Sequence, residues 1–500
     1  MGWNLNENLK RIAGDFPDRT VYQFMDKSTT YSELDFLVDR FAAALTREGI
    51  GKGDAVALLL GNTPHFVIAY YGILRSGAAA VPINPIFSPR EIEYILANSE
   101  AKAAISIPQL QPVLANLKQQ LKHLDFVVYT EKVDTESSFD QFITSANLNF
   151  ISPIIDKDDL AVILYTSGTT GEPKGAMLTH LNMGSNAQAC TKLFELTHED
   201  RIITVLPIFH VFCMTVCLNA TITCGATMLL LPKFSPTEVV KTIREQEATI
   251  FAGVPTMYNF LLQVPDATAE DFQSIRSCVS GGAPMPVALL NKFEQKYEVQ
   301  VMEGYGLSEA SPVTAFNPIR GVRKPGSIGV DIPYVTNKVV DPNGQEVPRG
   351  EIGELIVQGP NVMKGYLGMP EVTEMALRDG WLYTGDMARM DEEGYLYIVD
   401  RKKDVILVGG YNVYPREVEE VIYEHPAIIE TAVIGVPDPE YGEAVKAFVV
   451  SKDASLTESE LLEFCKGKIA KYKLPTYVEF LQELPKNTTG KILRRQLQNL

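Results

Sequence analysis

Cysteine is scarce in this 500-residue chain, and the six that occur include no Cys-x-x-Cys pair. Cys213 and Cys217 are four residues apart, but no set of histidines or cysteines with zinc-site spacing follows them. This pattern argues against a disulfide framework and against a structural zinc site. It is typical of buried thiols in a reducing compartment.

Long uncharged hydrophobic runs are also missing. The longest apolar stretch, residues 66–83, is interrupted by Arg75, Ser76 and two glycines, whereas a membrane span needs about 20 mostly uncharged residues. We therefore expect a buried helix that runs into a strand. The first residues lack a basic region followed by an apolar run, and Asn6 stands where an N-myristoylation signal has Ser or Thr. We expect a cytoplasmic protein.

Positive charge is in deficit. The chain has 62 acidic and 45 basic residues, which gives a formal net charge of −17. Such a chain repels phosphate backbones overall, so we expect no nucleic-acid partner, although a local basic pocket stays open. The 46% hydrophobic and 21% charged residues are ordinary for a globular protein and exclude a mostly disordered chain, a collagen-like repeat and a polytopic membrane protein.

Short apolar segments alternate with amphipathic ones along the chain. This alternation predicts α/β layers with largely parallel sheets. After about residue 323, glycine and proline become dense and the strands half-polar, which indicates a β-rich section. Mixed α and β patterns return from residue 400, and about 100 residues are enough for one small domain. The expected helices cover residues 31–41 and 91–97, and the expected strands cover 54–60, 103–107, 160–165, 201–206, 227–231 and 249–252.

A glycine-rich loop follows the strand expected at 160–165. Glycines let backbone N–H groups curl around an anion, hydroxyls donate further hydrogen bonds, and a lysine neutralises charge. These are the requirements of a polyphosphate cradle, and so many suitable residues make a plain polar turn the weaker interpretation. The spacing differs from that of a P-loop, because Pro173 precedes the lysine. The loop residues are Thr166, Ser167, Gly168, Thr169, Thr170, Gly171, Lys174 and Gly175.

Further motifs follow the loop in a fixed order. Together with Thr166–Gly175 they resemble the adenylate-forming enzymes, which include bacterial fatty acyl-CoA ligases, firefly luciferase and the adenylation domains of peptide synthetases. The resemblance spans nearly the whole chain. It implies an α/β fold: a large N-terminal domain (1–399) of layered α/β subdomains plus a β-rich section, and a small mobile α+β domain (400–500). The motifs are residues 281–284 (GGAP), 303–309 (EGYGLSE), 383–386 (YTGD), 400–404 (DRKKD), 409–417 (GGYNVYPRE) and 485–491 (PKNTTGK).

The resemblance implies an ATP site. Lys174 and the loop backbone would bind phosphates, while Asp386 and Arg401 would bind the ribose. Backbone at Gly281, Gly282 and Ala283 would lie flat against adenine beside Tyr305. Mg²⁺ would be held by Glu309 with Thr166. The remaining nucleotide residues that the resemblance implies are Glu303, Gly304, Gly306, Ser308 and Ile398.

The C-terminal motifs imply the catalytic steps. Lys491 would stabilise the charge that builds up as a carboxylate attacks the α-phosphate, although alone it would be an ordinary residue of a basic tail. Asp400 is similar to the family's hinge residue. Gly409, Gly410 and Tyr411 resemble the segment that lines the approach of the thiol of coenzyme A.

The acid is the least determined substrate. In the family, His210 lies near the carboxylate, and Val254 and Gly281 continue the acyl wall. The apolar residues 208–216 leave no partner for an ammonium group, which disfavours amino acids. We expect fatty acyl-CoA formation from a fatty acid, ATP and coenzyme A. An aryl-acid CoA ligase and an enzyme that loads a carrier protein in trans are the alternatives. A homodimer and peripheral membrane contact for long-chain acids stay open.

Overall fold

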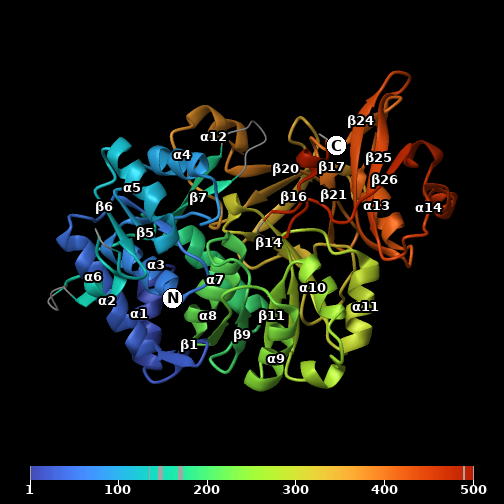
Figure 1. The fold of residues 1–500 in the computed structure, drawn as a ribbon. Coiled ribbons are helices and arrows are strands. Elements are labelled where there is room, and N and C mark those ends of the chain that lie inside the picture. Colours follow the sequence, from blue (N-terminus) through green and yellow to red (C-terminus); the bar gives the residue numbers. More distant parts are fainter. Residues whose placement is uncertain (1, 134–135, 145–149, 167–172, 488–489, 499–500) are drawn as a thin grey trace.

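The computed structural model describes residues 2–133, 136–144, 150–166, 173–487 and 490–498. Its two largest sheets lie in the N-terminal part of the chain (Figure 1). In the first sheet, five strands run parallel and two antiparallel strands close one edge. Its order is β18 (Gly365–Tyr366), β8 (Lys174–Thr179), β7 (Leu160–Thr166), β4 (Ala79–Pro82), β3 (Ala55–Leu59), β5 (Ala103–Ser106) and β6 (Phe126–Tyr129).

The second sheet is parallel through its centre and antiparallel at both ends. The site residues lie at and beyond the carboxyl ends of its central strands, where ligands bind in open α/β sheets. Its order is β15 (Val330–Asp331), β14 (Val313–Phe316), β13 (Val301–Gly306), β12 (Ser277–Ser280), β11 (Ile250–Gly253), β9 (Arg201–Thr204), β10 (Thr227–Leu230), β1 (Thr20–Phe24) and β2 (Lys27–Thr30).

Strand β3 shows why these strands read as continuous apolar runs. Val56 and Leu58 on one face join the core shared with the second sheet, while Ala57 and Leu59 on the other face join a separate core under α4 and α5. Both faces of a parallel strand are covered, so polar alternation is absent. The helix and strand expected over 66–83 are confirmed as α3 (Pro64–Ser76) and β4.

Helices cover both sheets, and local signals set several of their ends. Helix α2 starts with a capping box in which Thr30 and Glu33 bond each other's backbone N–H groups. Among the described residues, every helix is too short or too polar to cross a membrane. The helices of this part are α1 (Leu5–Asp15), α2 (Tyr31–Arg47), α3, α4 (Pro89–Ser99), α5 (Gln111–Gln120), α6 (Phe139–Thr144), α7 (His180–Leu193), α8 (Ala220–Cys224), α9 (Pro236–Gln246), α10 (Pro255–Leu262), α11 (Val287–Tyr297) and α12 (Pro370–Ala376), the π-helix η2 (Cys213–Asn219), and the 3₁₀ turns η1 (Pro108–Leu110), η3 (Ala269–Phe272) and η4 (Ser308–Ala310).

The β-rich section predicted after residue 323 is an antiparallel sheet with its own small core. Strand β21 pairs with β20 and places Asp386 opposite Arg401. The predicted domain boundary at 399/400 therefore falls inside β21 and stays a prediction. The order is β16 (Thr336–Val340), β17 (Ile352–Gln358), β20 (Trp381–Met390) and β19 (Leu377–Arg378), and β21 (Leu396–Arg401) also pairs with β20.

The last part of the chain has a sheet and cores of its own, and we call residues 400–500 the small domain. Figure 1 shows it beside the β-rich section, at the right of the view. Its strands are β23 (Tyr411–Val413), β22 (Ile406–Val408), β25 (Gly442–Ser451), β24 (Ile428–Asp438) and β26 (Tyr477–Phe480), and its helices are α13 (Pro415–Tyr423), α14 (Glu458–Cys465) and α15 (Arg494–Leu497), with the 3₁₀ turn η5 (Lys471–Lys473).

Candidate active site

The phosphate end of the site is built around Glu309, which the short turn η4 presents. Thr166 at the end of β7 lies with its hydroxyl 3.4 Å from Glu309 Oε1, and the Tyr366 hydroxyl donates to the same oxygen over 2.9 Å. Lys174 Nζ lies 5.5 Å from the centre of the Tyr366 ring. Burial, and then the Glu309 carboxylate, raise the pKa of Tyr366, so its hydroxyl stays a donor. Tyr366 belongs to no motif that the sequence singled out.

This donor set fits a magnesium ion that is held mainly by phosphates. Mg²⁺ is bound in such sites by one or two carboxylates together with phosphate oxygens and water. Among the residues that the structure describes, no cluster of three or more His, Cys, Asp or Glu side chains could hold a metal ion without the help of phosphate oxygens. The predicted loop residues Ser167, Gly168, Thr169, Thr170 and Gly171 lie outside the described residues.

The expected ribose site is a cluster of three side chains. The Tyr305 hydroxyl donates to Asp386 Oδ2, and Arg401 Nε lies 3.6 Å from Asp386 Oδ1. Burial, and next the charge of Asp386, raise the pKa of Tyr305. The structure thus brings together three residues that the sequence separates by up to 96 positions, and the Asp386 carboxylate has an acceptor lone pair for each ribose hydroxyl that approaches.

The predicted adenine wall follows β12. Gly281 donates its N–H to Gly253 O over 3.3 Å, and a β-carbon at position 281 would lie 3.3 Å from Phe212 Cζ. Gly282 has φ +79°, a conformation that favours glycine. The next residue, Ala283, continues this turn towards α11.

Several other predicted nucleotide residues have packing roles in the structure. A β-carbon at Gly304 would overlap the Phe316 ring, and one at Gly306 would overlap the Pro312 carbonyl, so both strands can approach closely only with glycine. The Glu303 carboxylate accepts from Gly326 N–H over 2.9 Å. Ser308 opens the turn η4, and its carbonyl accepts from Ser311 N–H. Their predicted part in nucleotide binding stays a prediction.

Lys491 reaches the site from the small domain. Asn487 fixes its backbone, because the Asn487 side chain accepts from Lys491 N–H and Asn487 N–H donates to Lys491 O, both over 2.9 Å. Burial, and then the charge of Arg401, lower the pKa of Lys491 to about 8, while Asp386 opposes that effect. The lysine therefore lies among the groups of the expected ribose site and still carries its charge at pH 7.

His210 faces the same place. Burial, and then the charge of Lys491, lower the pKa of His210 to about 4. The imidazole is therefore neutral at pH 7. Its Nδ1 accepts from Phe212 N–H over 3.3 Å, which leaves the proton on Nε2 as a free hydrogen-bond donor. The predicted pair Lys491 and His210 is thus brought together, with one cation and one neutral donor.

The wall beside His210 is apolar. Phe212 and Val254 are buried, and the π-helix Cys213–Asn219 behind them is buried throughout. The polar groups of that helix are satisfied within the protein: Thr215 donates to Ser311 O over 2.7 Å, and Asn219 bonds to Tyr70 and Tyr71. No charged residue occurs in 208–219.

The segment expected to guide the thiol makes its contacts within the small domain. Gly409 donates its N–H to Tyr441 O over 2.8 Å, and the Tyr411 ring packs on Tyr472 with centroids 5.0 Å apart. Tyr411 is 63% exposed, and Gly410 has φ +85° in the turn between β22 and β23. In this arrangement the small domain presents Lys491, rather than Gly409–Tyr411, to His210.

Asp400 is buried and heavily bonded. Its carboxylate accepts from Arg401 N–H over 2.8 Å and from Arg416 N–H over 2.9 Å, and Arg494 Nη1 lies 3.4 Å away. Burial raises the pKa of Asp400, and the charge of Arg494 opposes that rise.

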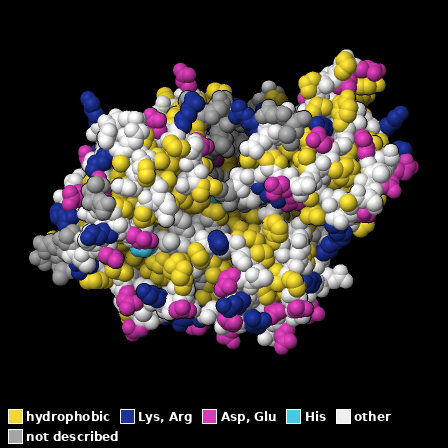
Figure 2. All heavy atoms as spheres, viewed as in Figure 1, with side chains coloured by type: hydrophobic (Ala, Val, Ile, Leu, Met, Phe, Trp, Pro, Cys, Tyr) yellow, Lys and Arg dark blue, Asp and Glu magenta, His cyan; other side chains and the backbone are white. Residues whose placement is uncertain are grey.

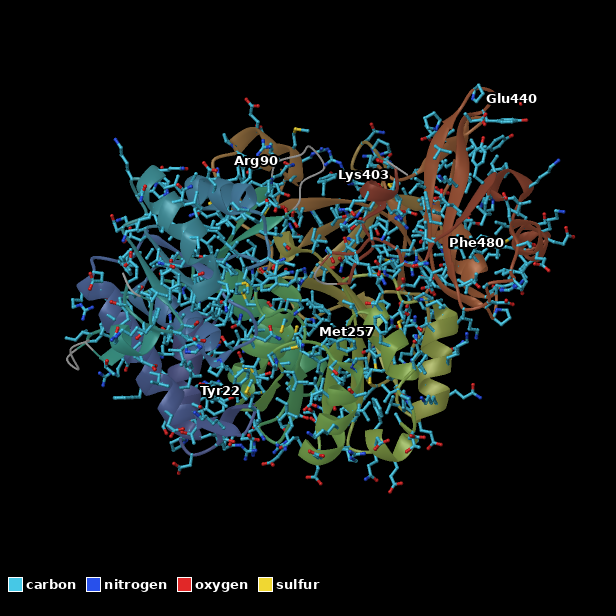
Figure 3. The ribbon with its side chains drawn as sticks, in the orientation of Figure 1. Tyr22, Arg90, Met257, Lys403, Glu440 and Phe480 are labelled. Carbon is cyan, nitrogen blue, oxygen red and sulfur yellow. The ribbon has the colours of Figure 1, made fainter. Side chains whose placement is uncertain are left out.

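Figure 3 shows where the two parts of the chain meet. Met257 marks α10, Phe480 and Glu440 mark the small domain, and Lys403, just after β21, lies at the junction. Tyr366 and Arg494 lie outside the predicted motifs, and Arg416 lies in the motif 409–417 without a predicted role.

Comparisons with known proteins agree over the whole chain. The family described as AMP-binding enzyme matches residues 9–367, and the one described as AMP-binding enzyme C-terminal domain matches residues 417–491. A relative named long-chain-fatty-acid--CoA ligase from Bacillus subtilis is 43% identical, and the alignment covers 98% of this chain and 94% of the relative.

Solved structures are similar as well. ATP-bound MatB from Rhodopseudomonas palustris is 35% identical, with a TM-score of 0.94 over 100% of this chain and 99% of that one. The apo structure of the same protein gives 0.83 over the same coverage. The anthranilate CoA ligase AuaEII, in complex with anthranoyl-AMP, is 30% identical, with a TM-score of 0.93 over 99% of this chain and 96% of that one. The arrangement described above is therefore more similar to the ATP-bound form of MatB.

Proposed function

This chain belongs to the AMP-binding, adenylate-forming enzyme family, and on that premise we propose that it is a fatty acid–CoA ligase. In the first step, a carboxylate oxygen of the fatty acid bonds to the α-phosphorus of ATP as the bond to pyrophosphate breaks. In the second, the sulfur of coenzyme A bonds to the acyl carbon, AMP leaves, and the thiol proton passes to solvent. The products are fatty acyl-CoA, AMP and pyrophosphate.

The proposal rests on one observation: Lys491 of the small domain and His210 of the large domain lie at the same site. Negative charge develops on the α-phosphate oxygens during the first step, and a positioned cation in a partly buried site stabilises it. Lys491 supplies that cation beside Arg401. The neutral His210 donates from Nε2 to one carboxylate oxygen and leaves the other free to attack. Lys174 and the backbone around it would bind the phosphates, and Mg²⁺ at Glu309 would neutralise the pyrophosphate that leaves.

A fatty acid fits the wall beside His210 better than a charged acid. Burial of the acyl chain against Phe212, Val254 and the π-helix gains about 0.8 kcal/mol per methylene. An ammonium group would be buried there without a partner. The name of the 43% identical relative supports the same class. An aryl acid is the second candidate, because the similar enzyme AuaEII binds anthranoyl-AMP.

The test uses the purified full chain with ATP, Mg²⁺ and dodecanoate. Without coenzyme A we expect pyrophosphate release and acyl-adenylate detectable by mass spectrometry. With coenzyme A we expect dodecanoyl-CoA and AMP in equal amounts. Adenylate without any thioester would support an enzyme that loads a different acceptor, and no adenylate with any fatty acid would refute the proposal.

The environment of the protein remains an expectation. A cytoplasmic location, a homodimer and contact with a membrane surface are not needed for either chemical step. On the face drawn in Figure 2, the Lys and Arg side chains are interspersed with Asp and Glu, which supports small-molecule substrates rather than a nucleic acid as the ligand.

A further inference from the structure

Arg416, in the small domain, makes hydrogen bonds to two residues of strand β21, Ile398 and Asp400. Its guanidinium Nη1 donates to Ile398 O over 2.8 Å, and its own backbone N–H donates to Asp400 Oδ2 over 2.9 Å. Ile398 belongs to β21, which pairs with β20 of the β-rich sheet, whereas Arg416 starts α13 of the small domain. Arg416 is 8% exposed. The side chain therefore connects the small domain to Ile398, two residues before the predicted hinge residue Asp400.

The charge of Arg416 also acts on a second group of the large domain, the carboxyl group of Glu303. Glu303 ends the buried part of β13. Burial raises the pKa of its carboxyl group to about 7, and the hydrogen bond from Gly326 N–H and then the charge of Arg416 oppose that rise. On its own side Arg416 Nε lies 3.8 Å from Glu420 Oε1. The buried arginine thus lies near a carboxylate of its own domain, while its hydrogen bond to Ile398 O reaches the β-rich sheet.

Arg494 provides a contrast within the same cluster. It binds Glu419 through two hydrogen bonds from Nη2, of 2.7 and 2.9 Å, and its Nη1 lies 3.6 Å from Asp404 and 3.4 Å from Asp400. All these partners lie at residue 400 or beyond. Rotation of the small domain about Asp400 preserves the contacts of Arg494 with Glu419, but it must break the contact of Arg416 with Ile398 O.

We propose that Arg416 is a positioning residue that holds the small domain in the arrangement with Lys491 beside His210. This inference rests on the proposed two-step function. The side chain touches no substrate. It acts by stabilising the arrangement that forms acyl-adenylate, and its release from Ile398 O accompanies the rotation that exposes the adenylate to the thiol.

The experiment measures the two half-reactions separately in single turnover. One is acyl-adenylate formation from dodecanoate and ATP without coenzyme A, and the other is thioester formation from supplied dodecanoyl-adenylate. Arg416→Met keeps the apolar stem and the backbone bond to Asp400 but removes the guanidinium. We expect adenylate formation to fall about tenfold and thioester formation to stay equal or rise. Arg416→Lys keeps the charge towards Glu303, and we expect it to recover part of the loss.

Arg495→Met is the matched control, because Arg495 is exposed on the same short helix as Arg494; neither half-reaction should change. Thermal unfolding is measured for each variant. If the rates of both half-reactions fall by the same factor and the Tm is lower, Arg416 has only a structural role and the inference is overturned. Unchanged halves in both Arg416 variants would overturn it too. If the proposed function itself is wrong, the wild-type protein already forms no adenylate, so the two failures are distinguishable.

Discussion

Gly490 of the small domain packs against Thr256 of α10: a β-carbon at position 490 would lie 2.6 Å from Thr256 Oγ1 and 3.2 Å from Val254 Cγ2. Gly490 also has φ +80°, which L side chains rarely adopt. The residue before Lys491 therefore approaches the apolar wall beside His210 as closely as the backbone allows. Any side chain there would hold Lys491 away from His210.

Gly490→Ala is expected to lower the rate of acyl-adenylate formation by roughly tenfold or more, because overpacking costs roughly 1–3 kcal/mol. Gly467→Ala is the matched control, since Gly467 lies in the same domain with φ +78° and open space where the methyl group would be. Both variants carry the backbone cost, but only the first has the clash. Rapid-quench measurement of adenylate checks the difference, and equal rates in the two variants would show that the contact with Thr256 has no effect on Lys491.

Lys491→Ala is expected to lower adenylate formation by roughly 100- to 1,000-fold, the usual effect of the loss of one preorganised charge-stabilising group. Thioester formation from supplied acyl-adenylate should survive, because the rotation of the small domain that precedes this step carries Lys491 away from the α-phosphate. The measurement is single-turnover kinetics of each half-reaction. A similar loss in both halves would assign the lysine a structural role.

The pH dependence follows from the same residue. A lysine with a lowered pKa is charged below about pH 8 and neutral above it, so adenylate formation should decline as the pH rises through about 8. The negative charge of bound ATP favours the protonated lysine, so in the ATP complex this decline occurs at a higher pH. Lys491→Arg stays charged throughout, and whatever activity it keeps should lack the alkaline limb. An identical limb in that variant would assign the titration to another group.

His210→Ala should lower kcat/KM for the acid by about tenfold, since it removes a hydrogen bond to a charged group. His210→Gln should retain more activity, because its amide N–H can take the place of the Nε2–H donor. Steady-state kinetics with varied dodecanoate distinguish the two. Because His210 is neutral above about pH 4, neither variant should change the profile between pH 5 and 8. Should His210→Gln be as impaired as His210→Ala, the donor role would be wrong.

Much of the fold could be predicted because its signals are local. The apolar run that became β3 and the Thr30–Glu33 capping box of α2 are visible within a few residues. Lys174, Glu309 and Lys491 were identified because each lies in a motif whose order along the chain is specific. The structure adds the contacts that position these side chains, and the family membership supports their predicted roles.

The rest depends on contacts between distant positions. Nothing near Tyr366 in the sequence indicates that its hydroxyl donates to Glu309. Arg416 lies in the motif 409–417, but the motif does not give its partner, because its bond to Ile398 O depends on how two domains meet. Gly304 and Gly306 read as nucleotide-binding glycines, yet close strand approach explains them equally well. A motif gives residue types, but the bonding partners come only from the tertiary arrangement.

The central claim is that the apolar wall beside His210 selects a fatty acid, and one series of measurements tests it directly. Catalytic efficiency is measured for saturated fatty acids from acetate to hexadecanoate, with benzoate, anthranilate and phenylalanine in the same assay. At about 0.8 kcal/mol per methylene, each added carbon should raise kcat/KM up to about fourfold until the pocket is full, and phenylalanine should be inert. A higher efficiency for an aromatic acid or an amino acid than for every fatty acid would contradict the assignment.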